Sequence, residues 1–164
     1  MSMQEDTPQL YFTKKFIAEL TPIRSTHQAN LRILKTRDGR QFVGKMEKSS
    51  IKKWIKDFMF VASKHKPDVP YTGPLEVTFY FAFPLIKSDK GKPAPMTTKP
   101  DFDNLCKSVC DAMTKLGFWS DDSQITFGKV VKFRNPHPYV GVEIKQATYM
   151  DKTYFDAIEN HLRT

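Results

Sequence analysis

One stretch of this sequence carries most of its information about fold and function: Lys99-Pro-Asp-Phe-Asp-Asn-Leu-Cys-Lys-Ser-Val-Cys-Asp111. An extended, proline-containing segment turns into a predicted helix here, and Gly117 ends that helix. Five of the 18 acidic residues lie between Asp101 and Asp122, although the formal net charge of the chain is +8. Paired carboxylates of this kind suit a hard divalent cation, so the stretch indicates metal-assisted phosphodiester hydrolysis.

Strands are predicted on both sides of this stretch. Residues 74–84 form the clearest one, because apolar side chains alternate through it and bury one face of a sheet. They are Leu75, Val77, Phe79, Phe81 and Phe83. Residues 125–134 and 139–144 give two further strands after the acidic segment Gly117-Phe-Trp-Ser-Asp-Asp-Ser-Gln-Ile125. Residues 87–99, rich in Pro, Lys, Gly and Thr, predict an irregular loop that leads into the acidic motif.

The rest of the chain adds four elements. We expect a strand over residues 10–20 and a hairpin whose strands, 31–35 and 40–43, flank an Asp-Gly turn. A helix capped by Ser49 or Ser50 follows, with an apolar stripe from Ile51 to Ala62. A last helix covers residues 151–163.

The resulting order, β-ββ-α-β-α-ββ-α, predicts an α/β (α+β) fold with a mixed sheet and packed helices. We expect a single domain over residues 1–164, with 1–9 flexible and 148–164 forming a C-terminal helical extension. The sequence contains neither a run of about 18 apolar residues nor a signal-peptide pattern. We therefore expect a cytoplasmic protein without a membrane partner.

Positive charge is concentrated in one quarter of the chain. Residues 24–66 contain twelve Lys or Arg and three acidic residues, so this region carries +9 and the remainder −1. A basic region is often only a solvated face, but this concentration favours a polyanionic partner such as DNA. The basic region and the acidic motif are separate in the sequence, which predicts separate binding and catalytic parts.

The acidic motif has a structural interpretation as well as a catalytic one. We expect Asp103 to cap the helix and Asp101 to point to the same side, with Lys107 one turn further along. A helix of 14 residues is about 21 Å long, so Asp122 reaches Asp101 only if the next strand runs back along the helix. In the structural interpretation Asp103 is merely a cap, Lys107 its ion-pair partner and Asp121-Asp122 a turn.

The extended motif decides between these interpretations. Residues 99–107, Asp111-Ala, Gly117-Phe-Trp and Asp121-Asp-Ser-Gln124 together strongly resemble the RusA family of Holliday junction resolvases, small dimeric endonucleases of bacteria and phages. The resemblance covers about residues 74–144. It implies that Asp101, Asp103 and Asp122 bind Mg²⁺, with Mn²⁺ able to substitute, and that Lys107 is catalytic or contacts the phosphate.

We therefore predict a Mg²⁺-dependent homodimer that resolves four-way DNA junctions by paired nicks, in recombination and repair. DNA would be held by basic residues near the site and in the basic region, namely Arg24, Arg32, Lys35, Arg37, Arg40 and Lys99. Two alternatives remain open, a non-catalytic nucleic-acid-binding protein with the same fold and a nuclease that prefers flaps or forks. Phe118 and Trp119 are expected in the core rather than between DNA bases, and Cys106 and Cys110 as small buried side chains.

Overall fold

We describe the protein from a computed structural model, which covers residues 12–24, 30–46 and 49–164. A five-stranded mixed sheet forms its centre, in the order β1-β7-β4-β6-β5. The bounds are β1 Thr13–Ala18, β4 Leu75–Pro84, β5 Ala94–Pro95, β6 Ile125–Asn135 and β7 Tyr139–Gln146. The predicted fold class is confirmed, with β5 as an addition. The residues 1–9 that we expected to be flexible lie outside the described part.

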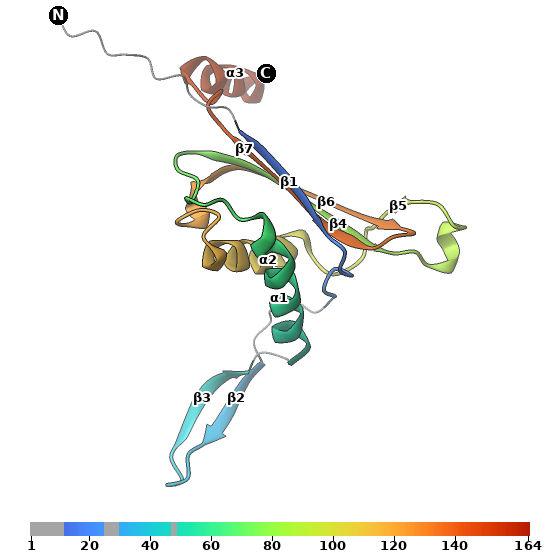
Figure 1. Cartoon of the computed structure of the whole chain (residues 1–164), viewed down its shortest axis with the longest axis vertical. Helices are drawn as coiled ribbons and strands as arrows, with labels where there is room; N and C mark the ends of the chain where they lie inside the picture. Colours follow the sequence, from blue (N-terminus) through green and yellow to red (C-terminus); the bar gives the residue numbers. More distant parts are fainter. Residues whose placement is uncertain (1–11, 25–29, 47–48) are drawn as a thin grey trace, which may run out of the picture.

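Two helices cover one face of the sheet, α1 Ser49–Ala62 and α2 Phe102–Leu116 (Figure 1). The alternating side chains of β4 point toward them and are almost fully buried, as predicted. Leu105, Val109, Ala112 and Met113 of α2 pack into the same core. Burial of this apolar face, rather than helix propensity, holds α2 in place.

The central strands β4 and β6 pair in parallel, whereas β7 runs antiparallel to β4 on the other side. Neighbouring parallel strands need a crossover connection, and here that connection contains α2. The acidic motif therefore lies on the link between β4, the middle strand of the sheet, and its neighbour β6.

Two elements lie apart from the sheet and its helices. The predicted hairpin consists of β2 Asn30–Lys35 and β3 Gln41–Met46, which form a two-stranded sheet of their own. Figure 1 shows it projecting beyond α1. The C-terminal helix, α3 Lys152–Arg163, lies near one end of the main sheet and has no buried residue. Within the described residues, no helix is long and apolar enough to cross a membrane.

Candidate active site

The N-terminus of α2 presents Asp101 and Asp103 to solvent. Asp101 occupies the N-cap position with extended backbone, yet its side chain accepts no capping hydrogen bond. Asp103 lies in the first turn of the helix. Our prediction that Asp103 is the cap was wrong, because the helix begins earlier, at Phe102. Neither carboxylate has a hydrogen-bond or ion-pair partner within the described residues, so both are available to a ligand.

The segment before Asp101 is fixed by the side chain of Lys132. Its ammonium group donates hydrogen bonds to the carbonyl oxygens of Thr98, at 2.7 Å, and Pro100, at 2.8 Å. Further back, Arg134 pairs with Asp89 at 2.8 Å, and the Asp89 side chain is only 4% exposed. Residues 87–99 form the predicted loop, which includes a 3₁₀ turn and the short strand β5 and is attached to β6.

Sequence reasoning missed Lys132 and Arg134 as residues that position the site. Both lie on β6 opposite Phe81 and Phe83, whose side chains face the core. A charged residue at a core-facing strand position needs a partner, because an unpaired charge there is costly. This departure from the apolar alternation was the available signal.

The second acidic segment forms a 3₁₀ turn, Asp122–Gln124, between α2 and β6. Asp121 caps this turn by accepting a hydrogen bond from the Ser123 amide at 2.8 Å. Hydrogen bonds from Ser123 lower the pKa of the Asp121 carboxyl below its usual value. The Gln124 side chain ties the turn to the chain before β4 by donating to the carbonyl oxygens of Tyr71 and Gly73. Asp122 has no such partner in the described part of the chain.

The position of Asp122 follows from its effect on Cys110. Burial raises the pKa of the Cys110 thiol, and the charges of neighbouring Cys106, Asp122 and Asp111 contribute to its value of about 12. Asp122 therefore lies beside the second half of α2. The strand after it does run back along the helix, because Lys132 meets Pro100 at the helix start.

Metal binding depends on how closely the candidate carboxylates are grouped. Across residues 12–24, 30–46 and 49–164, no three His, Cys, Asp or Glu side chains are close enough to hold one ion together. The donor type nevertheless fits a hard cation, since Asp101, Asp103 and Asp122 are exposed carboxylates without protein partners. The candidate ligands thus agree with Mg²⁺ in chemistry, but in the described residues they do not form a group of three around one ion.

Lys107 lies on the solvent side of α2 together with Asp103 and Asp111, as the four-residue spacing predicted. Its positive charge counteracts the rise in the pKa of both thiols, which places it near Cys106 and Cys110. It has no ion-pair partner within the described residues. An unpaired ammonium group beside the carboxylates is suited to a phosphate.

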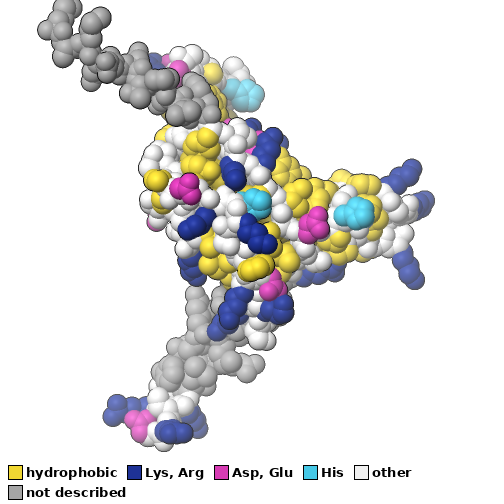
Figure 2. Space-filling model, viewed as in Figure 1, with side chains coloured by type: hydrophobic (Ala, Val, Ile, Leu, Met, Phe, Trp, Pro, Cys, Tyr) yellow, Lys and Arg dark blue, Asp and Glu magenta, His cyan; other side chains and the backbone are white. Residues whose placement is uncertain are grey.

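The predicted DNA-contacting residues fall into three places. Lys35, Arg37 and Arg40 are exposed around the tip of the hairpin, where Arg40 also pairs with Asp38 at 3.3 Å. Lys99 is exposed two residues before Asp101, and Arg24 is exposed after β1. The side chain of Arg32 lies outside the described residues. Figure 2 shows Lys and Arg side chains over the part of the molecule nearest the hairpin and at the hairpin tip.

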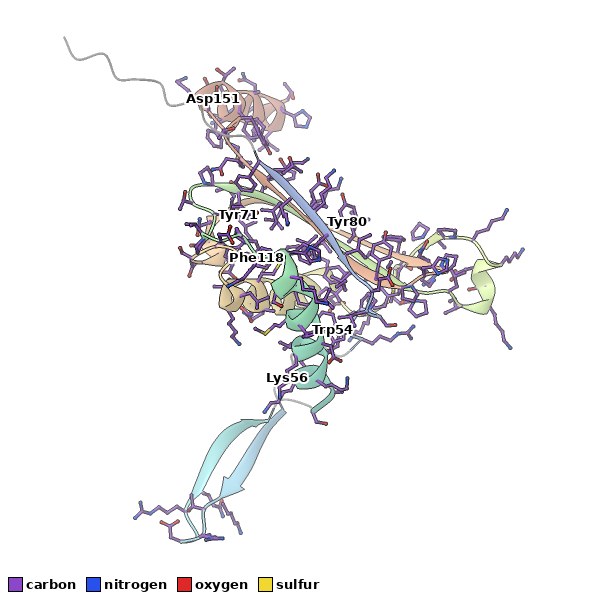
Figure 3. The ribbon with its side chains drawn as sticks, in the orientation of Figure 1. Trp54, Lys56, Tyr71, Tyr80, Phe118 and Asp151 are labelled. Carbon is purple, nitrogen blue, oxygen red and sulfur yellow. The ribbon has the colours of Figure 1, made fainter. Side chains whose placement is uncertain are left out.

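The aromatic residues around the site differ in exposure. Trp119 is 1% exposed and donates its indole N–H to Thr114 at 2.7 Å, and Phe118 is fully buried. The expected core role of both is confirmed, and Figure 3 shows Phe118 near Tyr71, whose amide donates to the Phe118 carbonyl oxygen at 2.8 Å. Phe102, by contrast, is 66% exposed between the two acidic residues.

Comparison with known proteins identifies the class of enzyme. The family model described as Endodeoxyribonuclease RusA matches residues 22–145, which include both acidic segments, the hairpin and the whole sheet except β1 and the last residue of β7. The protein is therefore an endodeoxyribonuclease by descent. It belongs to the RusA family.

Three relatives show the extent of the similarity. The uncharacterized protein YqaN of Bacillus subtilis is 37% identical over 108 residues, which cover 58% of this chain and 75% of YqaN. The crossover junction endodeoxyribonuclease rusA of Lactococcus phage r1t is 40% identical over 44% of this chain and 53% of its own length. Crossover junction endodeoxyribonuclease RusA of Escherichia coli K12 is 50% identical over 38 residues, 32% of its length.

Proposed function

We propose that this protein is a Mg²⁺-dependent endonuclease that resolves four-way DNA junctions. Two relatives carry the name of crossover junction endodeoxyribonuclease, and the family model spans both acidic segments. The observation that carries the proposal is the pair Asp101 and Asp103, two exposed and unpartnered carboxylates at the start of α2. The structural interpretation called for a cap at Asp103 and an ion pair with Lys107, and neither is found among the described residues.

Each site residue has a separate role in this proposal. Asp101, Asp103 and Asp122 would hold Mg²⁺, for which Mn²⁺ could substitute, and binding would have to bring the three carboxylates closer together than they lie in the described structure. The bound metal supplies Lewis acidity toward a phosphoryl oxygen and an activated water. Lys107 binds a non-bridging oxygen of the scissile phosphate and offsets the charge that develops there. Lys132 keeps the Asp101 backbone in place from the neighbouring strand.

DNA arms are held by the exposed basic residues of the hairpin and by Arg24, Arg32 and Lys99. A chain with one acidic site makes one nick at a time, so symmetric resolution calls for a two-fold homodimer. We place the protein in the bacterial cytoplasm, encoded by the cell or by a phage, and in DNA recombination and repair.

The test is cleavage of a labelled four-way junction by the whole protein with and without Mg²⁺. Asp103→Asn should abolish nicking while leaving the melting temperature and metal-free junction binding close to wild type. Asp156→Asn, at an exposed carboxylate of α3 that pairs with Lys152, is the matched control. Binding without any nicking by wild type would instead support a non-catalytic protein, and faster cutting of flaps or forks would support the other nuclease specificity.

A further inference from the structure

A groove lies between α1 and α2, the helix that carries Asp103. Its volume is about 240 Å³, and its polar lining consists of Lys52, Lys56, Ser108, Asp111 and Lys115. Lys52 and Lys56 are one turn apart on α1, and the other three side chains come from α2. Figure 3 labels Lys56 on the part of α1 nearest the hairpin. None of these residues belongs to the metal, catalytic or DNA-contacting set assigned above.

The charge of this groove lacks a counterpart in the protein. None of its three lysines forms an ion pair within the described residues, and Asp111 is the only acidic side chain in its lining. The formal charge of the groove is therefore +2. Lys53, on the same helix, is instead paired with Asp57 at 2.6 Å. Unpaired cations on two facing helices favour an anion in the groove between them.

Ser108 gives an independent indication of a ligand. It is 1% exposed, and its hydroxyl is the buried side-chain polar group that lacks a hydrogen-bond partner in the described part of the structure. Buried hydroxyl groups are normally paired, because an unpaired one loses its hydrogen bonds to water without replacement. A bound oxyanion in the groove would supply the acceptor that Ser108 lacks.

The location of the groove indicates which anion it takes. Ser108 follows Asp103 by five residues, about 7.5 Å along the helix axis, which equals the rise of roughly two nucleotides in a DNA strand. Lys107, proposed to contact the scissile phosphate, is the residue before Ser108. A strand passing the acidic residues therefore reaches the groove within a few nucleotides.

We propose that the α1–α2 groove binds a backbone phosphate of the DNA strand flanking the cleaved bond. The ammonium groups of Lys52, Lys56 and Lys115 contact the phosphate, and the Ser108 hydroxyl donates a hydrogen bond to it. This inference rests on the proposed nuclease function and adds a specific phosphate site to it.

The test measures junction affinity against salt concentration in the absence of divalent metal, by fluorescence anisotropy. Lys56→Gln with Lys115→Gln should weaken binding about tenfold and reduce the slope of log K against log salt by roughly 0.9 for each lost phosphate contact. The matched control is Lys53→Gln with Lys64→Gln, which removes two exposed charges outside the groove. Equal losses of junction affinity in the two double variants would overturn the assignment of the groove as a phosphate site.

Ser108→Ala tests the contribution of the hydroxyl group to junction binding separately from that of the lysine charges. Removing an unpartnered buried hydroxyl should leave the melting temperature unchanged or higher, whereas junction binding should weaken about threefold. Removing a hydroxyl that has only a structural role would not change the affinity for the junction. Unchanged binding would therefore overturn the assignment of the Ser108 hydroxyl to the phosphate.

Inorganic phosphate distinguishes a free anion from DNA. Free phosphate should raise the melting temperature of wild type but not of the Lys56/Lys115 double variant if the groove binds this anion. If that double variant also binds DNA as well as the control variant does, the groove takes free phosphate and the inference about DNA fails. If wild type neither binds nor cuts a junction, the proposed function fails instead, and the phosphate experiment still reports on the groove.

Discussion

Asp121 and Asp122 are adjacent in the sequence, but only Asp121 is engaged by the protein, through the amide of Ser123 at 2.8 Å. The sequence alone did not separate them physically. Because Asp122 has no partner in the described residues, its carboxylate is the one available to a metal.

We predict that Asp122→Asn lowers cleavage by about a hundredfold or more, the scale typical of removing one electrostatic group from an active site. Its melting temperature should stay close to wild type. Asp121→Asn should remain active, because asparagine caps helical turns as well as aspartate does. The measurements are junction cleavage rates and thermal melts, and loss of cleavage in Asp121→Asn alone would reverse the assignment.

The contact between Lys132 and Pro100 predicts a positioning effect. Lys132→Met leaves the carbonyl oxygens of Thr98 and Pro100 without their donor, so stability should fall by about 1–3 kcal/mol. Cleavage should fall as well, since the backbone entering Asp101 is no longer fixed. Lys132→Arg, which keeps a donor, should recover part of both.

Lys129→Met provides the control for Lys132. Lys129 is exposed on the same strand, and its side chain makes no hydrogen bond or ion pair within the described residues. If both methionine variants reduce cleavage equally, the effect is one of strand charge and not of the contact with Pro100.

The buried side chain of Asp89 predicts a pH dependence. The hydrogen bond from the Ile86 amide, followed by those from Arg134, holds the pKa of the Asp89 carboxyl below its ordinary value. A lowered folded-state pKa contributes stability that is complete at neutral pH and is lost as the pH falls through the carboxyl range. The difference in urea midpoint between wild type and Asp89→Asn should therefore shrink between about pH 6 and about pH 3.

Arg134→Gln removes one of the causes of that low pKa. In this variant the same loss of stability should begin at a higher pH than in wild type. A pH profile identical to that of wild type would show that the Ile86 amide alone determines the ionisation of Asp89.

The raised pKa values of the two cysteine thiols predict slow alkylation. With the pKa of Cys110 raised to about 12, only about one thiol in ten thousand is ionised near pH 8. Cys110 should resist iodoacetamide in the native protein, and Cys106, which is less buried and whose pKa burial also raises, should react slowly. Mass spectrometry after timed labelling measures both, and a urea-unfolded sample, in which both must react, is the control.

Local pattern was sufficient to predict most of the elements and the exposed row on α2. The alternation in β4 predicted the central strand, and the four-residue spacing placed Asp103, Lys107 and Asp111 on one side of the helix. Gly117 ends α2 in the left-handed conformation expected of glycine there. These features depend on residues a few positions apart, where sequence periodicity is informative.

What the sequence did not predict depends on contacts between distant residues. The direction of β6 relative to α2 follows from the pairing of β4 with β6, whose partners are some fifty residues apart. The same holds for the contact of Lys132 with Thr98 and for that of Gln124 with Tyr71. The cap was misplaced for a local reason, because aspartate at either position satisfies the pattern and helix starts vary by a residue or two.

The location of α2 as the connection between β4 and β6 limits how this enzyme can be controlled. The helix that carries the acidic residues also supplies a large part of the core, so it cannot unfold without disrupting the sheet. Segments of this kind open only with the whole domain, whereas sites on exposed loops can be inactivated locally. Control of the nuclease must therefore act from outside, by governing which DNA reaches an acidic surface that is present whenever the protein is folded.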